Sequence, residues 1–205
     1  KSVWDLLPVG AFVIIPFLLV LKQPDLGTSL VFLAILLGMV FVAGIDGKLL
    51  LKILGVGAAC MPAFWFFLKD YQKSRLTVFL DPNVDPLGAG YHIIQSKIAI
   101  GSGQLFGKGL FAGSQSQLNF LPENHTDFIF AVIGEELGFV GSIVILALYF
   151  LLLYRGVKTA QNARDKFGAL LAAGITSMMA FHVMVNIGMT IGIMPVTGIP
   201  VPFMG

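Results

Sequence analysis

The sequence predicts an all-α polytopic membrane protein, and three features of its composition lead to that prediction. Of its 205 residues, 57% are hydrophobic and 12% are charged, whereas about 25% of the residues in a typical soluble domain are charged. The mean hydropathy is +0.89. The net charge of +2 gives no reason to expect a nucleic acid as partner. A single cysteine, Cys60, excludes an intrachain disulfide and a cysteine-based metal site.

Five apolar segments are candidates for membrane-spanning helices, each of which needs roughly 20 residues. They comprise residues 6–21, 27–44, 49–68, 128–154 and 167–193. Together they predict a single membrane domain over residues 1–205 with about five transmembrane helices. Because five is an unusual count and both ends of the chain are abrupt, we expect the chain to be a fragment of a longer membrane protein.

The charges of the short loops predict how these helices are oriented. Residues 155–166 contain four basic side chains and one acidic side chain, so this segment is expected on the cytoplasmic side. Counting back along the helices places residues 46–52 inside as well, and the long segment 69–127 outside. A loop of that length is expected to carry structure or function of its own.

Within this extracytoplasmic loop, residues 91–100 predict a short amphipathic helix. Ile94 and Ile98 lie four residues apart with polar residues between them, which puts both on one face of a helix. Such a helix is suited to lie on the outer membrane surface, or simply to cover the helical bundle. The residues that follow, 101–109, resemble a phosphate-binding loop but lack its Ser or Thr, so we exclude that motif.

Polar residues concentrate at the outer mouth of the fourth apolar segment, where Glu123, His125, Thr126 and Asp127 fall within five residues. A carboxylate between water and hydrocarbon is partly desolvated, which raises its pKa toward the range that suits a general base. Alternatively, Thr126 or Asp127 caps the helix that follows, where an acid is favourable at the positive end of the helix dipole. The two interpretations are compatible.

Four more polar residues fall inside predicted spans, namely Glu135 and Glu136 in the fourth, and His182 and Asn186 in the fifth. A charge at mid-bilayer costs a few kcal/mol, so such residues usually face other helices and are paired or functional. We interpret these four as structural, with His182 or Asn186 hydrogen-bonded to a glutamate. A proton or ion path is the alternative.

Asp25 is expected to cap the second span from the outside, on the same membrane face as Asp127. Outward-facing carboxylates can hold a divalent cation, because hard cations take oxygen ligands. Asp25 and Asp127 are therefore candidate metal ligands. Taken together, the residues predict a helical membrane protein whose chemistry lies at its outer face.

Short motifs along nearly the whole chain resemble the shape, elongation, division and sporulation (SEDS) family of bacterial cell-wall polymerases. In chain order they are residues 23–28 (QPDLGT), 79–82 (FLDP), 88–91 (GAGY), 95–96 (QS), 121–130 (LPENHTDFIF), 134–138 (GEELG) and 186–189 (NIGM), followed by Pro195. Residues 97–103, 117–120 and 195–200 are more similar to the elongation branch than to the division branch. The resemblance implies that the chain is the C-terminal half of a longer protein, without its last span.

The resemblance also implies an activity, namely a peptidoglycan glycosyltransferase that polymerises lipid II into glycan strands for cell elongation and shape. Lipid II is a disaccharide pentapeptide linked to undecaprenyl pyrophosphate. Asp127 would be the catalytic base. The candidate substrate contacts are Arg75, Gln95, Ser96, Lys97, Glu123, His125 and Thr126. For Arg75 and Lys97, a plain anchor at the membrane interface is the alternative.

Further expectations follow from the same resemblance. They are a divalent cation such as Mg or Mn with no organic cofactor, and a class B penicillin-binding protein as partner. The location would be the bacterial inner (cytoplasmic) membrane, with the active site facing outward.

Two other functions stay open at this stage. A lipid II flippase would use the intramembrane charges Glu135, Glu136 and His182 for coupled transport. A non-catalytic scaffold of the cell-wall synthesis complex would need neither these charges nor a reactive loop. A polymerase should depend on the extracytoplasmic loop and on Asp127, which separates the three possibilities.

Overall fold

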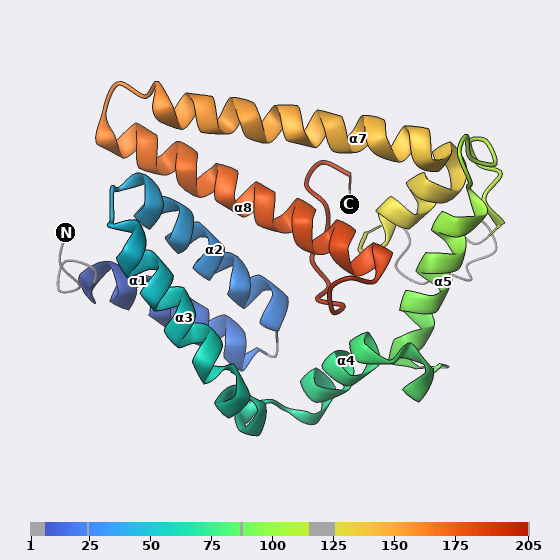
Figure 1. Cartoon of the computed structure of the whole chain (residues 1–205), viewed down its shortest axis with the longest axis horizontal. Coiled ribbons are helices and arrows are strands. Elements are labelled where there is room, and N and C mark those ends of the chain that lie inside the picture. The colour runs from blue at the N-terminus through green and yellow to red at the C-terminus, as the bar shows by residue number, and fades with distance from the viewer. Residues whose placement is uncertain (1–6, 24, 87, 115–125, 205) are drawn as a thin grey trace. The chain divides into compact units, whose positions relative to one another are not determined.

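The computed structural model describes residues 7–23, 25–86, 88–114 and 126–204 (Figure 1). Within these residues the regular structure is helical and contains no strand, as the composition predicts. The α-helices are α1 (Leu7–Lys22), α2 (Leu26–Val42), α3 (Gly47–Phe64), α4 (Asp70–Leu80), α5 (Ala89–Ser102), α7 (Ile129–Gln161) and α8 (Lys166–Ile191). Two short 3₁₀ helices, η2 (Trp65–Phe67) and η3 (Pro82–Val84), follow α3 and α4.

Each of the five predicted spans overlaps one α-helix of the structure, namely α1, α2, α3, α7 and α8. Among the described helices, α7 and α8 are long and apolar enough to cross a membrane, with 33 and 26 residues and mean hydropathies of 2.4 and 1.7 over their most apolar parts. α1 and α2 are shorter, at 16 and 17 residues. The helical class is thus confirmed, while the number of spans stays a prediction.

α7 extends further than the sequence predicts. Residues 155–161 are expected in a loop, but they form the last turns of this helix. The reason is that Arg, Lys, Ala and Gln are good helix formers, so the helix does not end where its apolar residues end. The ammonium group of Lys158 also lies over the ring of Tyr154, 5.3 Å from its centroid.

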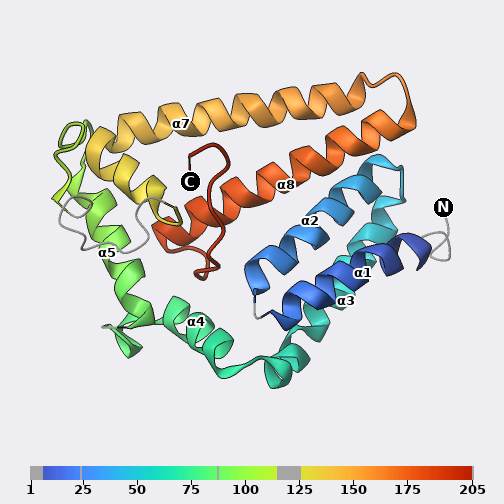
Figure 2. The same cartoon turned by 180° about the vertical axis from the view of Figure 1, so that it is seen from behind.

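The chain forms two compact units, of which the first contains residues 1–68 and 153–181. In this unit α1 and α2 form a helical hairpin (Figures 1 and 2). Small residues let α2 approach the first part of α8, since a Cβ added at Gly38 would overlap the side chain of Ser177. Close backbone approach at small residues is typical of helix pairs in membranes.

The second unit contains residues 69–152 and 182–205, and so includes the predicted extracytoplasmic loop. α5 is the helix predicted over residues 91–100, and it ends at Ser102, with Gly103 as its C-cap. α4 is not predicted from the sequence, because its apolar residues follow no clear helical period. After α8, residues 192–204, here called the C-terminal segment, turn back toward α7 (Figure 1).

The core of the second unit forms where α7, the end of α8 and the C-terminal segment meet. Its buried side chains are Phe130, Tyr149, Val183, Ile187 and Val201. A smaller cluster joins α5 to the start of α7 and is made by Ala99, Phe128 and Ala131. These contacts set the positions of the elements that surround the site described below.

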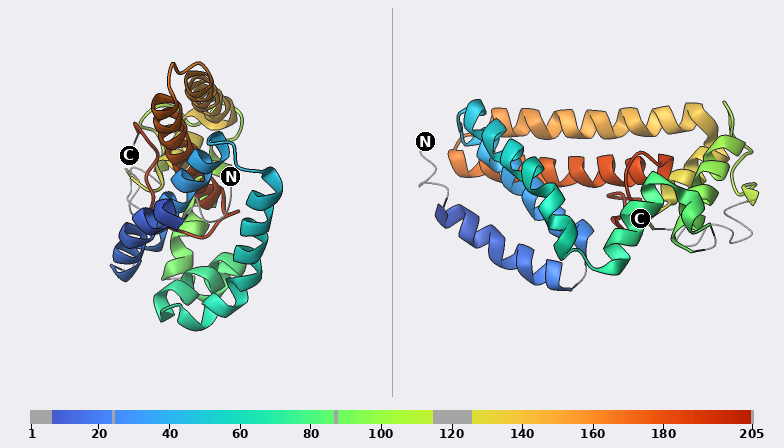
Figure 3. Two further views of the ribbon diagram at one scale, coloured as in Figure 1. Left: turned by 90° about the vertical axis from the view of Figure 1, so that its left-hand side faces the viewer. Right: turned by 60° about the horizontal axis from the view of Figure 1, so that its bottom comes forward.

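α7 is broken near its N-terminal end, at Gly138 (Figure 3). The backbone there has φ 67° and ψ −163°, a region that essentially only glycine adopts. The break divides α7 into a short part, residues 129–137, and a long part, residues 139–161. A broken helix leaves N–H and C=O groups without helical partners, and in apolar surroundings those groups must be satisfied elsewhere.

Residues 104–109, here called the plug loop, supply those partners. Their N–H groups donate to the last carbonyls of the short part, and their carbonyls accept from the first N–H groups of the long part. The hydrogen bonds are Lys108 N to Glu135 O at 3.0 Å, Gly109 N to Glu136 O at 3.0 Å, Phe139 N to Gln104 O at 2.9 Å and Val140 N to Leu105 O at 3.1 Å. The fit is close, since a Cβ added at Gly107 would overlap the Glu136 carbonyl oxygen.

We predict that Gly138→Ala destabilises the protein by about 3 kcal/mol or more, because the new Cβ would be strained at this φ and would crowd the plug loop. An added Cβ would overlap the Gly107 nitrogen. Thermal unfolding of the purified protein in detergent measures the effect. Gly101→Ala is the control, because a Cβ there has no atom within 4 Å and Gly101 lies inside α5. Equal melting temperatures for the two variants would show that the break does not require glycine.

Candidate functional site

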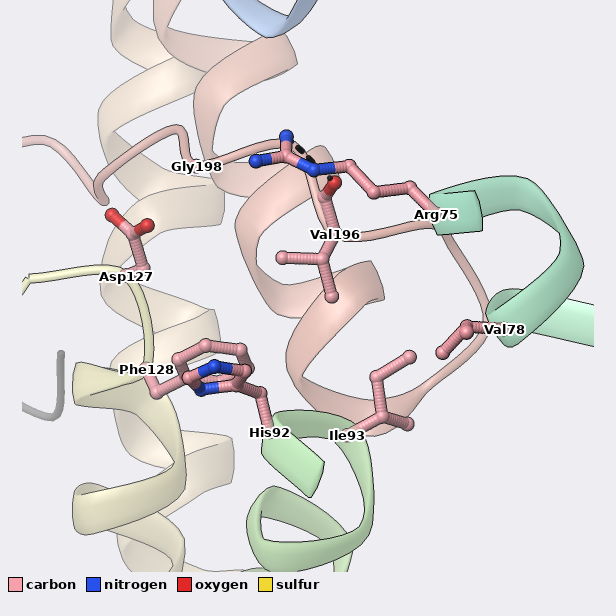
Figure 4. A pocket seen from close by; sticks show the side chains of 8 residues that line it. All are labelled: Arg75, Val78, His92, Ile93, Asp127, Phe128, Val196 and Gly198. Carbon is pink, nitrogen blue, oxygen red and sulfur yellow. Dashed lines mark hydrogen bonds between the residues drawn. The ribbon is translucent and has the colours of Figure 1, made fainter. Parts of the chain in front are cut away.

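A cavity of about 260 Å³ lies in the second unit, where four parts of the chain meet (Figure 4). It is lined by Arg75 and Val78 of α4, His92 and Ile93 of α5, Asp127 and Phe128 at the start of α7, and Val196 and Gly198 of the C-terminal segment. The structure therefore brings together two residues selected from the sequence, Asp127 and Arg75, which come from opposite ends of the extracytoplasmic loop.

Asp127 is half-buried at the edge of the cavity, and its backbone is held by Asn186. The side-chain amide of Asn186 donates to Asp127 O at 2.8 Å and to Ile199 O at 2.7 Å. Asn186 is fully buried, and its Oδ1 atom has no hydrogen-bond partner within the described part of the chain. The sequence predicts a bond from Asn186 or His182 to a glutamate. For Asn186 this is wrong, because both amide hydrogens are taken by backbone carbonyls.

The C-terminal segment forms the wall next to Asp127 and is fastened at further points. Tyr149 Oη donates to Pro202 O at 2.6 Å, and His182 Nδ1 lies 3.3 Å from Pro200 O. Gly198 has φ +74°, and a Cβ added there would lie 3.4 Å from Asp127 Oδ2. Glycine is favoured here by the positive φ, and the segment passes close to the carboxylate.

Arg75 is exposed and approaches the cavity from α4. Its Nη1 atom donates to Val196 O at 3.3 Å, which anchors the guanidinium against the C-terminal segment. In Figure 4 the side chains of Arg75 and Asp127 both extend toward Gly198. An arginine has five N–H donors, so one backbone contact leaves donors for an anionic group in the cavity.

His92 is the third polar side chain of the cavity, and it was not selected from the sequence. Its ring stacks on Phe128, with centroids 5.9 Å apart and planes at 9° (Figure 4). The sequence feature that could have selected His92 is its position one helical turn before Ser96 in the predicted amphipathic helix. That signal is weak, because a histidine on a half-buried helix face is common without a function.

The other predicted contacts on α5 lie away from the cavity. Ser96 is fully buried, and its hydroxyl donates to Thr190 O of α8 at 2.7 Å, so in this structure it joins helices and is closed to a ligand. Lys97 is exposed and packs beside Gly192, where an added Cβ would overlap its side chain. Gln95 is half-buried and does not line the cavity.

The remaining predicted residues of the loop lie just before α7. Glu123 and His125 fall outside the described residues. Thr126 is exposed and adjoins Asp127. α7 begins at Ile129, one residue later than expected, and the capping interpretation of Thr126 and Asp127 stays a prediction.

Glu135 is fully buried and forms an ion pair with Lys108 of the plug loop, at 2.8 Å. Ser114 completes the cluster, because its hydroxyl lies 3.0 Å from Lys108 Nζ and 3.3 Å from Glu135 Oε1. The neighbouring Glu136 is half-buried, and its backbone carbonyl accepts from the plug loop. Lys108 was missed as a partner because the pairing depends on the break in α7, which the sequence pattern does not reveal.

No cluster of three or more His, Cys, Asp or Glu side chains suited to a metal ion occurs in the described ranges. The Asp25 carboxylate caps α2, since its Oδ1 accepts from Thr28 N at 2.9 Å. That confirms the predicted cap. Asp25 belongs to the first unit and Asp127 to the second, and a shared metal site stays a prediction.

Comparison with known proteins gives consistent matches. A family model described as cell cycle protein, for the FtsW, RodA and SpoVE group, matches residues 1–205. The chain is 53% identical over 191 residues to the peptidoglycan glycosyltransferase MrdB of Escherichia coli (strain K12), covering 93% of this chain and 52% of that protein. It is 44% identical over 199 residues to the stage V sporulation protein E of Bacillus subtilis (strain 168), covering 96% and 53%.

A solved structure, described as the structural coordination of polymerization and crosslinking by a peptidoglycan synthase complex, is also similar. It has a TM-score of 0.78 and 40% identity, over 98% of this chain and 55% of that one. The chain thus spans about half the length of the proteins that it matches.

We predict that Lys108→Met lowers stability more than the double variant Lys108→Met/Glu135→Gln. Removing only the lysine takes the ion-pair partner from a buried carboxylate, which costs up to about 3–5 kcal/mol, whereas removing both charges is far less costly. Melting temperatures of the wild type, both single variants and the double variant complete the cycle. If the single lysine variant melts no lower than the double variant, the two charges are not coupled.

Proposed function

Because the chain belongs to the FtsW, RodA and SpoVE family of cell cycle proteins, we propose that the full-length protein is a peptidoglycan glycosyltransferase that polymerises lipid II. The observation that carries this proposal is that the Asp127 carboxylate and the Arg75 guanidinium, from distant parts of the loop, line the same cavity. Glycosyl transfer to a sugar hydroxyl needs a proton acceptor and positive charge near the departing pyrophosphate, and this cavity offers both.

In the proposed reaction the 4-hydroxyl of the acceptor sugar attacks the anomeric carbon of the donor sugar. A carbon–oxygen bond forms, the bond from that carbon to pyrophosphate breaks, and undecaprenyl pyrophosphate leaves with the bonding electrons. Asp127 takes the hydroxyl proton as general base. Its position depends on Asn186, which holds the Asp127 backbone in register with the C-terminal segment.

Arg75 is proposed to stabilise the charge that develops on the leaving pyrophosphate. Preorganised donors aimed at developing charge are a large term in catalysis, and arginine suits phosphate because its donors form a rigid fork. The Val196 carbonyl fixes the guanidinium before the substrate arrives, so little reorganisation is needed during the reaction.

A divalent cation is also proposed, with Asp127 as its protein ligand. Magnesium is commonly held by one or two carboxylates together with substrate phosphates and water, and the Asp127 carboxylate lines this cavity. When bound, the ion would neutralise charge on the pyrophosphate. Asp25 remains a weaker candidate ligand.

The proposed setting is the bacterial inner membrane, crossed by about five helices of this chain, with residues 69–127 and the cavity on the outer side. The long apolar helices α7 and α8 and the basic residues 155–166 support it. A class B penicillin-binding protein is the proposed partner, supported by the similar structure of a complex for polymerization and crosslinking. A role in cell elongation is proposed from the motifs at residues 97–103, 117–120 and 195–200.

Topology can be tested with single cysteines in a Cys60→Ala background. We predict that Ser74→Cys, in exposed α4, reacts with an impermeant thiol reagent on intact spheroplasts. Gln161→Cys, at the exposed end of α7, should react only after permeabilisation. Labelling of position 161 but not 74 on intact spheroplasts would reverse the proposed orientation.

We predict that Asp127→Asn lowers glycan-strand synthesis by roughly 10²–10⁴-fold, the usual contribution of a general base. Asparagine keeps the shape, caps a helix about as well as aspartate and retains an oxygen that can coordinate a cation, so folding and lipid II binding should be retained. Strand synthesis from labelled lipid II, by the purified full-length protein with its partner, measures the effect.

Asp70→Asn is the matched control, because Asp70 is an exposed carboxylate of the same loop that does not line the cavity. The control should retain synthesis within about twofold, since an exposed charge contributes little. Synthesis by Asp127→Asn at the level of this control would falsify the assignment of the base. Loss of synthesis in a stable Glu135→Gln variant would instead favour transport through the spans.

A further inference from the structure

Among the described residues, three polar side chains line the cavity, and the proposed chemistry uses two of them, Asp127 and Arg75. His92 is the third, and its surroundings restrict what it can do. Its ring is stacked on Phe128, which is only 2% exposed. The stack fixes the plane of the imidazole, so its nitrogens have defined directions.

The two ring nitrogens of His92 differ in their environment. Nδ1 is buried and has no hydrogen-bond partner in the described part of the chain. Nε2 is not a buried atom without a partner. Because His92 lines the cavity, Nε2 is the nitrogen that a ligand there can reach. A buried N–H without an acceptor is rarer and more costly than an unused acceptor. We therefore assign the proton of the neutral ring to Nε2.

The size of the cavity indicates which part of a substrate meets this donor. A cavity of about 260 Å³ has room for at least one sugar ring or one phosphate group. A ligand group seated there would contact Asp127, Arg75 and His92 together.

We propose that His92 is a further substrate-contacting residue, whose Nε2–H donates a hydrogen bond to an oxygen acceptor of the sugar–pyrophosphate part of the substrate. This inference rests on the proposed function. The acceptor is either a phosphate oxygen or a sugar oxygen. Arg75 and His92 then provide donors and Asp127 the acceptor, so the cavity distinguishes the leaving group from the attacking hydroxyl.

The test compares His92→Phe with His92→Gln in the full-length protein. Phenylalanine keeps the aromatic stack and removes both nitrogens, whereas glutamine places an amide near the Nε2 position. Affinity for lipid II, measured at equilibrium in an Asp127→Asn background to prevent turnover, should fall about tenfold in His92→Phe, as expected for one lost hydrogen bond. His92→Gln should stay within threefold of the parent.

Stability separates this role from a purely structural one. His92→Phe replaces an unpartnered buried nitrogen by carbon, so its melting temperature should equal or exceed that of the wild type. If His92→Phe does not fold, His92→Gln and His92→Leu form a second pair that differs mainly in the polar group. Leucine should then bind lipid II about tenfold more weakly than glutamine. Affinity within twofold of the parent in the folded phenylalanine variant, or equal affinity in the second pair, overturns the proposal.

Competition by inorganic pyrophosphate, at constant free magnesium, distinguishes the two acceptors. If His92 contacts phosphate, pyrophosphate competes less well in His92→Phe than in the parent. If it contacts a sugar oxygen, lipid II affinity falls while competition by pyrophosphate is unchanged. Failure of the wild type with its partner to make glycan strands would overturn the proposed function and leave the binding result for His92 separate.

Discussion

Two hydrogen bonds from the side-chain amide of Asn186 hold the candidate site together. One goes to the carbonyl of Asp127 before α7, and the other to the carbonyl of Ile199 in the C-terminal segment. A fully buried amide between two segments far apart in sequence restricts both, because a buried carbonyl left without its donor costs about 1–3 kcal/mol. Asn186 therefore links the two sides of the cavity wall, Asp127 and the segment that contains Gly198, and Tyr149 and His182 hold that segment at further points.

The break in α7 lets the N-terminal part of this long apolar helix take a different direction from the rest, and the cavity residues Asp127 and Phe128 directly precede that part. The break at Gly138 separates the short part, residues 129–137, from the long part, and the short part packs against α5, where Gly134 lies beside Ile100. The plug loop meets the backbone groups that the break exposes, and the Lys108–Glu135 pair lies at the same point. In that pair Glu135 is fully buried whereas the Lys108 side chain is 30% exposed, and the pair ties the plug loop to the short part of α7.

The elements that supply the polar groups of the site are themselves held by hydrogen bonds to neighbouring elements. α5 is joined to α8 through the Ser96 hydroxyl, and the C-terminal segment to α7 through Tyr149. The guanidinium of Arg75 rests on the backbone of that same segment. Groups held by such a second layer of hydrogen bonds need little reorganisation when charge develops, and electrostatic catalysis depends on that property.

The sequence by itself determined the helical class, a helix in each apolar segment and the cap at Asp25. It also selected Asp127 and Arg75 as candidate site residues. These follow from composition, from local periodicity and from family motifs. The tertiary structure alone decided that Asn186 binds carbonyls and not a glutamate, that Ser96 faces α8, and that Lys108 pairs with Glu135. It also showed the break at Gly138 and the place of His92 in the cavity. The physical reason is that residue types reveal burial and local conformation, whereas the partner of a buried donor depends on which distant backbone the packing brings within 3 Å.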